Sequence, residues 1–290
     1  MTILSDARRG ARSGAVLAAA IAAFGLTAGC GGGDGDGDEG DGARGGLGAD
    51  QRRRADQLVS VFENGTTRIQ YAYAENLGDG RGVTAGRAGF TTGDGDALEV
   101  VRAYTKRVPD NPFARFVPGL EREARGTGGK GSGGSGAPFP DAEFIAAWKR
   151  AAADPAFRDV QDAQVDERYF TPAARAAEKA GLRSPLALAE LYDASIQHGN
   201  GPDRDGLPAL IKRTTAEAGP PSKAGEKAWL DAFFDVRVDD LTHPANPDTA
   251  EEWRKSVDRV EALRRIAKSG NRDLDGPFEV TAFGSTHTIK

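Results

Sequence analysis

The spacing of apolar residues along the chain predicts a mainly helical protein. Between residues 55 and 62, apolar side chains recur at intervals of three and four positions, which places them on one helical face, and Gly65 would end that helix. The run 96–99, Asp-Ala-Leu-Glu, resembles a capping box that opens a second helix to about residue 108. A longer amphipathic pattern over residues 248–268, closed by Gly270, predicts a helix near the C terminus.

One region, residues 69–92, has the pattern of β-strands. Ile69, Tyr71 and Tyr73 occupy alternate positions, and the glycines that follow Asn76 allow tight turns. We therefore expect an α+β protein that is mainly α and contains one small β-sheet.

The N-terminal segment has the organisation of a bacterial export signal. Arginines in residues 8–12 precede an apolar run at 15–26, and small residues lead to Cys30, the one cysteine of the chain. This ending resembles a lipobox, so we expect residues 1–29 to be a lipoprotein signal peptide and Cys30 to be lipidated. The alternative is plain secretion with an incidental cysteine. A membrane-spanning helix is disfavoured because the apolar run is shorter than the ~20 residues that cross a bilayer.

Residues 30–48 consist largely of glycine and acidic residues, which cannot build a core. We expect this segment to be a disordered tether that carries the lipidated cysteine. Aspartates at alternate positions in 34–38 have the spacing of a calcium loop, but Glu39 stands where such a loop needs glycine. Calcium binding is therefore not expected, and neither a metal ion nor a cofactor is predicted for the chain.

Residues 49–290 have an ordinary globular composition and are long enough for one large domain or for two lobes that share a cleft. The full chain has a net charge of −5, and residues 1–29 contribute +2, which leaves −7 for the mature protein. Nucleic acid is not expected as a partner, because its binding requires a concentrated basic face. A cationic substrate suits the negative charge.

Two carboxyl groups near the predicted sheet could act as an acid and a base. Glu63 lies in the last turn of the first helix, where the helix dipole and partial burial both favour the protonated form. Asp79 lies in the glycine-rich run 78–82, where Arg81 could hold it ionised. Such an asymmetric pair is what a glycosidase needs. On these residues alone, a surface charge at a helix end and a turn-forming aspartate remain the alternative.

Short motifs around these carboxyls closely resemble those of the glycoside hydrolase family 46 chitosanases. They are Glu63-Asn64, Gln70-Tyr71-Ala72-Tyr73, the run 78–86 (GDGRGVTAG), Gly89-Phe90 and Gly95-Asp96. Further matches extend through most of the domain, with Tyr104, Trp148, Tyr169-Phe170, Tyr192-Asp193-Ala194, His198-Gly199, Phe234-Asp235 and Gly270-Asn271. The resemblance implies a lysozyme-like fold with two lobes around a substrate cleft, and endo-cleavage of β-1,4 glucosaminyl bonds with inversion.

The resemblance also implies roles for individual residues. Glu63 matches the family's general acid, Asp79 its general base, and Thr84 the residue that positions the attacking water. Asp96 matches a carboxylate that binds a glucosamine amino group, a role compatible with capping the helix that follows it. Arg81 belongs to the same substrate-binding side, where we expect it mainly to support Asp79.

Asp166, Arg237 and Arg259 match a buried charge network that in the family connects the cleft to the catalytic acid. Charged residues on separate helices are otherwise expected on solvated faces. His198 matches a family position, but a lone histidine at a helix end is usually structural, so no catalytic role is assigned to it. Residues 241–248 depart from the family where acidic cleft residues are expected, so no substrate contacts are predicted there.

Chitosan and glucosamine oligosaccharides are thus the predicted substrates of a monomeric enzyme outside the cell. We expect it to be held on the outer face of the bacterial membrane by the lipid on Cys30, with no other membrane contact. Two alternatives stay open, a lysozyme-fold hydrolase that acts on peptidoglycan and a non-catalytic carbohydrate-binding lipoprotein.

Overall fold

The computed structural model describes residues 46–78, 80–126, 139–247 and 250–290. The predicted signal peptide 1–29, Cys30 and most of the predicted tether 30–48 lie outside these residues, and so does Asp79. Within the described part of the chain, no helix is long and apolar enough to cross a membrane.

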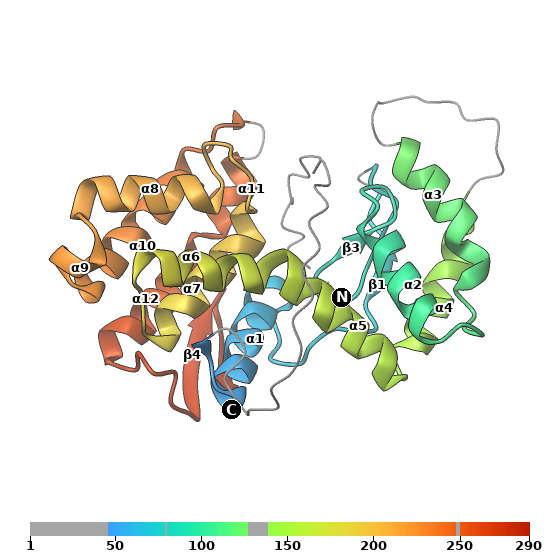
Figure 1. Cartoon of the computed structure of the whole chain (residues 1–290), viewed down its shortest axis with the longest axis horizontal. Coiled ribbons are helices and arrows are strands. Elements are labelled where there is room, and N and C mark those ends of the chain that lie inside the picture. Colours follow the sequence, from blue (N-terminus) through green and yellow to red (C-terminus); the bar gives the residue numbers. More distant parts are fainter. Residues whose placement is uncertain (1–45, 79, 127–138, 248–249) are drawn as a thin grey trace, which may run out of the picture.

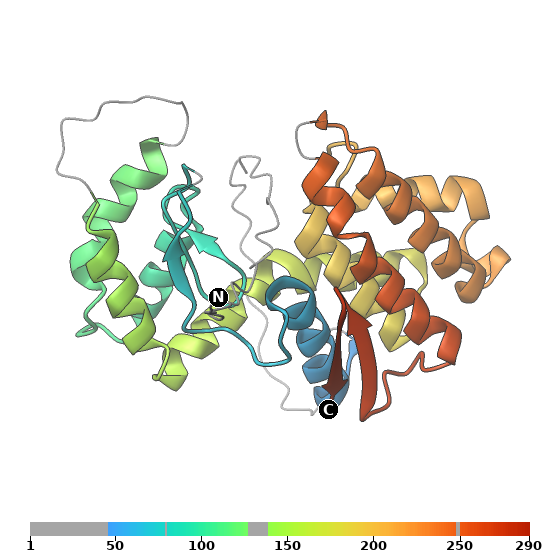
Figure 2. The same cartoon turned by 180° about the vertical axis from the view of Figure 1, so that it is seen from behind.

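The described chain folds into two lobes, which Figures 1 and 2 show from opposite sides. The first lobe contains β1 (Ala74–Asn76), β2 (Val83–Ala85), β3 (Phe90–Thr91), α2 (Asp96–Arg107), the short helix η2 (Ala114–Phe116), α3 (Val117–Gly126) and α4 (Asp141–Ala151). The second contains α1 (Ala49–Asn64), α6 (Thr171–Ala180), α7 (Pro185–His198), α8 (Leu207–Ala218), α9 (Pro221–Ala224), α10 (Glu226–Thr242), α11 (Ala250–Lys255), α12 (Val257–Ser269), β4 (Phe278–Ala282) and β5 (Ser285–Ile289). The lobes are joined by α5 (Pro155–Val165) and the π-helical turn η3 (Asp166–Phe170), which continues into α6. The predicted mainly helical, two-lobed α+β class is confirmed.

The predicted helix ends are mostly correct. α1 ends at Gly65, whose φ of 64° is left-handed and is therefore readily adopted by glycine. The helix predicted after Gly95 is present, but Asp96 is its first residue rather than its cap, and Glu99 pairs with Arg168 instead of closing a capping box.

The long helix predicted over residues 248–268 is broken. α11 ends at Lys255 and α12 begins at Val257, because the buried Ser256 donates its N–H to the carbonyl of Trp253, three residues back. This tighter turn interrupts the i to i−4 pattern of an α-helix.

The predicted sheet is present, with β2 between antiparallel neighbours β1 and β3. In its register Thr84 lies opposite Glu75 on one side and Thr91 on the other. The prediction of a single sheet is wrong, because β4 and β5 form a second antiparallel pair. The first strand of this hairpin does alternate apolar and polar residues, at Phe278, Val280 and Ala282, and sequence analysis overlooked that signal, whereas β5 is polar except at Ile289.

Buried apolar side chains of both lobes form one continuous cluster. Trp148 packs among phenylalanines in the first lobe, where its ring is 4.9 Å from that of Phe157. In the second lobe α7 is buried from Leu186 to His198. Polar residues on α7 therefore have to find partners inside the protein.

Candidate functional site

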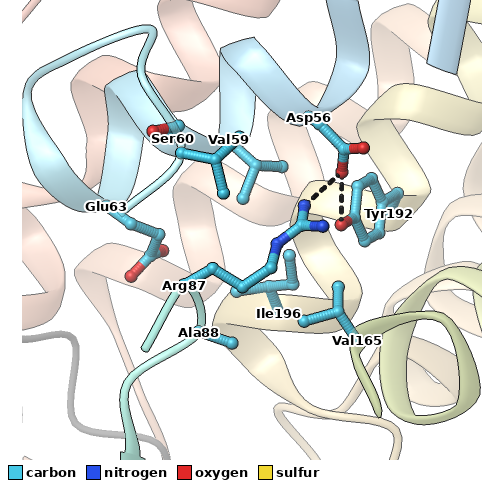
Figure 3. Close-up of a pocket in the computed structure, with 10 residues that line it drawn as sticks. Asp56, Val59, Ser60, Glu63, Arg87, Ala88, Val165, Tyr192 and Ile196 are labelled. Atoms are coloured by element: carbon cyan, nitrogen blue, oxygen red, sulfur yellow. Dashed lines mark hydrogen bonds and ion pairs between the residues drawn. The ribbon is translucent and has the colours of Figure 1, made fainter. Parts of the chain in front are cut away.

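Glu63 opens onto a pocket where the two lobes meet (Figure 3). The last turn of α1 buries Val61 and Phe62, while the Glu63 side chain keeps 17 % of its surface exposed. The pocket walls come from α1, the turn after β2, the end of α5, and α7. About 20 Å³ is open to the centre of a water molecule, which is enough room for bound water.

Arg259 on α12 holds the Glu63 carboxyl from the protein side. Its Nη1 lies 2.7 Å from Glu63 Oε1, an ion pair in which the N–H is not well aligned with the oxygen. Burial opposes the positive charge, but the neighbouring Asp193 and Glu63 raise the pKa of Arg259. The guanidinium is therefore a permanent cation that fixes where the Glu63 carboxyl points.

The pairing continues into the second lobe through Asp193 on α7. Arg259 Nη2 lies 2.6 Å from Asp193 Oδ1, and Arg237 Nη2 lies 3.0 Å from Asp193 Oδ2. Burial disfavours the Asp193 carboxylate, yet the two arginines outweigh it and lower its pKa. Arg237 also donates to Glu190 Oε1 at 2.7 Å. A continuous buried chain of charges thus connects α10, α7 and α12 to Glu63.

The structure brings Arg237 and Arg259 together, as the sequence motifs imply, but Asp166 is not between them. Asp166 lies in η3 and pairs with Arg52 at 2.5 Å, with 37 % of its side chain exposed. Asp193 occupies the expected position. Sequence analysis matched Asp193 to the family without giving it a role and did not single out Glu190, although two acids three residues apart in a largely apolar helix were a visible signal.

Thr84 lies in the central strand of the sheet. Its side chain is buried, and its hydroxyl has no hydrogen-bond partner among the described residues. The strand is packed closely at both ends, since a Cβ on Gly82 would lie 2.2 Å from Thr92 Oγ1 and a Cβ on Gly86 would lie 2.5 Å from Gln161 Oε1. Arg81 is half-buried beside this strand and forms an interaction, whereas Asp79 lies outside the described residues.

Asp96 stabilises the junction between β3 and α2. Its Oδ1 accepts from the backbone N–H of Thr91 at 2.6 Å and of Ala97 at 2.9 Å. Burial raises the pKa of Asp96 to about 6, against these hydrogen bonds. Burial raises the pKa of the Tyr169 hydroxyl, in η3, to about 12, and the negative charges of Asp96 and Glu63 add to this shift. Tyr169 is a further site residue that sequence analysis left without a role.

His198 is buried away from the pocket. Arg237 donates to its Nε2 at 3.4 Å, which leaves the ring proton on Nδ1, 3.3 Å from Asp240 Oδ2. Burial lowers the pKa of His198 to about 4, so the ring is neutral near pH 7. Of the divergent segment, residues 241 and 242 end α10 and residues 243–247 follow it, where Ala245 donates its N–H to Asp205 at 2.8 Å. Across the described ranges, no cluster of three or more histidine, cysteine or acidic residues could hold a metal ion.

Comparisons with known proteins identify the family of this two-lobed protein. Residues 57–278 match the family model of glycosyl hydrolase family 46. A chitosanase of Bacillus subtilis (strain 168) is 53% identical over 237 residues, which is 81% of this chain and 83% of that protein. A chitosanase of Streptomyces sp. (strain N174) is 35% identical over 252 residues, 84% of each chain.

Solved structures agree with the sequence comparisons. A mutant chitosanase from Bacillus subtilis MY002, complexed with 6 GlcN, superposes with a TM-score of 0.74 and is 50% identical, covering 84% of this chain and 100% of that one. A Gynuella sunshinyii chitosanase complexed with chitotetraose gives a TM-score of 0.73 at 44% identity, with coverages of 84% and 99%. The chain is therefore a glycoside hydrolase with the lysozyme-like fold. It belongs to glycosyl hydrolase family 46.

Proposed function

We propose that this protein is an endo-acting chitosanase that hydrolyses β-1,4 bonds between glucosamine residues with inversion at the anomeric carbon. The observation that carries the proposal is the arrangement around Glu63, a carboxyl at the junction of the lobes whose direction is fixed by the buried Arg259. The curated and structural relatives named above, all chitosanases, support the choice of substrate.

In this mechanism Glu63 donates a proton to the glycosidic oxygen as the bond breaks. Arg259, 2.7 Å from the carboxyl, stabilises the carboxylate that this transfer leaves behind. Asp79 is proposed as the base that removes a proton from the attacking water on the opposite face of the sugar. The Thr84 hydroxyl, which lacks a protein partner among the described residues, can bind and orient that water.

We propose that Asp96 recognises a glucosamine amino group and that Arg81 supports Asp79. The Asp96 hydrogen bonds to the backbone use Oδ1, so Oδ2 is the oxygen that can accept from a substrate ammonium. A charge-assisted bond of this kind is lost when the amine is acetylated.

The test is to incubate the purified enzyme with chitosan, chitin and peptidoglycan and to analyse the products. We expect the enzyme to release short glucosamine oligomers of mixed length from chitosan. We expect it to release soluble sugars much more slowly from chitin and peptidoglycan. Preferential release from peptidoglycan would favour the lysozyme-type alternative. Binding of glucosamine oligomers without cleavage of any polymer would favour the non-catalytic alternative.

For the N-terminal region we propose export and anchoring, with residues 1–29 as a lipoprotein signal peptide, 30–48 as a lipidated tether and 49–290 as the catalytic domain, acting as a monomer. The signal is the basic, apolar and small-residue order that ends at Cys30. In a bacterial host, Cys30→Ala should move the enzyme from the membrane fraction to the medium. An unchanged distribution would contradict the lipid anchor.

A further inference from the structure

Arg87 is a buried cation in the same pocket as Glu63, and nothing in the proposed reaction uses it. It follows Thr84 by three residues, in the turn that ends β2, and 5 % of its side chain is exposed. Figure 3 shows its guanidinium directed across the pocket toward α1 and α7. An arginine this deeply buried must be matched by acids.

Two acids from two other elements hold this guanidinium. Nη2 lies 2.7 Å from Oδ1 of Asp56 on α1, and Nη1 forms an ion pair with Asp162 on α5. Burial alone would lower the pKa of Arg87, but the nearby negative charges, of which Asp56 has the largest effect, raise it. The planar fork of arginine suits two acids at once, which a lysine cannot hold in the same geometry. We call these three residues the Arg87 cluster.

Tyrosines fix the two acids in turn. The Tyr192 hydroxyl donates to Asp56 at 2.9 Å, and the Tyr71 hydroxyl donates to Asp162 at 2.8 Å. The backbone is held as well, since the N–H of Arg87 donates to Gln161 Oε1 at 3.1 Å. The Arg87 cluster is therefore a braced connection from the sheet of the first lobe to α1 and α5, and not a mobile surface pair.

The connection joins the two sides of the reaction centre. Asp56 and Glu63 are seven residues apart on α1, two helical turns along one face, and both line the pocket. On the first lobe, Thr84 lies in β2, the strand that follows Asp79 in the sequence, and Arg87 comes three residues after Thr84. An inverting enzyme needs its two carboxyls about 6.5–9.5 Å apart to admit water, and a displacement of ~1 Å can cost ~10²-fold in rate.

We propose that Arg87 is a positioning residue whose two ion pairs set the separation between Glu63 on α1 and the β2 region that carries Thr84. This inference rests on the proposed function. It predicts that Arg87 acts on the rate of bond cleavage and not on the affinity for the oligosaccharide, because only 5 % of the side chain is exposed and the guanidinium is already paired with Asp56 and Asp162.

The experiment measures kcat and KM for hydrolysis of glucosamine hexamer by the full chain, Arg87→Met and Arg87→Lys. We expect kcat to fall by roughly 10–100-fold in Arg87→Met and by less in Arg87→Lys, with KM within about threefold of the wild type. The matched control is Arg107→Met, which removes an exposed ion pair between α2 and α5, 2.9 Å from Asp159. Its kcat should stay unchanged.

The outcomes separate this inference from the proposed function. No cleavage by the wild type would contradict the proposed function itself. An active wild type with an Arg87→Met variant that melts earlier but keeps its kcat at low temperature would show a purely structural role and overturn the inference. A raised KM with unchanged kcat would overturn it too, in favour of substrate binding.

A second variant covers the case in which Arg87→Met does not fold. Asp162→Asn removes the charge of one acid, which is 38 % exposed, and keeps the pair between Arg87 and Asp56. We expect kcat to fall several-fold at nearly constant KM, and a kcat equal to that of the wild type would overturn the inference. In an Arg87→Met and Asp162→Asn double variant, the two losses should combine to less than their product, since both act through one contact.

Discussion

The chemistry assigned to Glu63 depends on a single proton that the side chain can hold and deliver. Glu63→Gln preserves the shape of the group and removes that proton, so we expect kcat on glucosamine hexamer to fall by roughly 10²–10⁴-fold with little change in oligomer affinity. Kinetics and calorimetric titration with the hexamer measure the two quantities. Glu178→Gln, on the exposed face of α6, is the control. Retention of more than about a tenth of the wild-type rate would remove Glu63 from the role of acid.

Asp96 should make substrate affinity depend on pH. Because burial raises its pKa to about 6, the carboxylate that attracts an ammonium forms as the pH rises through 6. We expect the ratio of the KM of Asp96→Asn to the KM of the wild type to be above one and to rise from pH 5 to pH 7. Added salt should lower this ratio. The difference also requires the substrate ammonium, so the two proteins are compared only at pH values where the substrate amine stays protonated. A ratio near one at every pH and at low salt would leave Asp96 as a stabiliser of the β3–α2 junction alone.

Glu190 should affect stability in the opposite sense to an ordinary paired acid. Burial raises its pKa from 4.5 to about 7, although Arg237 opposes the shift. The native state therefore keeps a proton that the unfolded chain loses, and this contribution is complete below pH 4.5 and lost as the pH rises through 7.

We accordingly expect the unfolding free energy of Glu190→Gln, relative to the wild type, to increase by about 1–3 kcal/mol between pH 4.5 and pH 8. His198, whose pKa burial lowers to about 4, contributes a slope of opposite sign that is common to both proteins and cancels. Denaturant titrations at several pH values would measure the difference. A difference that does not change with pH would mean that Glu190 is ionised throughout.

At this scale the family motifs group Arg237 and Arg259, which meet in the structure, but they do not identify the acid that joins them. Thr84 and Asp96 lie within a short run whose spacing is fixed by the sheet and the start of α2. Asp193 was not assigned to the charge network, because its arginine partners lie on α10 and α12 and only the fold brings them together. Asp166, chosen in its place, lies in η3, outside that network.

Among the elements, the C-terminal hairpin supports the helix that carries Glu63. Ile289 is fully buried in β5, which packs against α1, and the N–H of Lys290 donates to Gln57 on that helix at 2.8 Å. We expect Ile289→Ala to lower the unfolding free energy by about 2–5 kcal/mol. Thr288→Ala, on the exposed side of the same strand, should change it by less than about 0.5 kcal/mol. Equal effects of the two substitutions in denaturant titrations would show that the hairpin does not support the core.

Local signals explain which elements are predictable. Gly65 follows α1 and Gly270 follows α12, both with left-handed φ. These helix ends can be predicted from the sequence because glycine adopts a left-handed φ more readily than other residues. The break at Ser256 depends instead on the burial of Ser256 and its backbone bond to Trp253, which a pattern of apolar residues does not contain. The strand β4 does alternate apolar and polar residues, and that signal was overlooked.

For the whole molecule, inversion requires two lobes that present an acid and a water from opposite sides of the sugar. The proposed acid, Glu63, lies on α1 of the second lobe, and Thr84, whose hydroxyl is proposed to position the water, lies on β2 of the first. Such an arrangement allows direct displacement by water, without a covalent intermediate, and so fixes the stereochemistry of the product.

The most direct test of this central claim is the configuration of the first product. Proton NMR spectra taken during the first minutes of glucosamine hexamer hydrolysis would resolve the anomeric signals of new reducing ends before mutarotation. The account predicts that the α-anomer appears first from the β-linked substrate. An initial β-anomer would contradict it, because retention would require a nucleophilic carboxylate where a base is proposed.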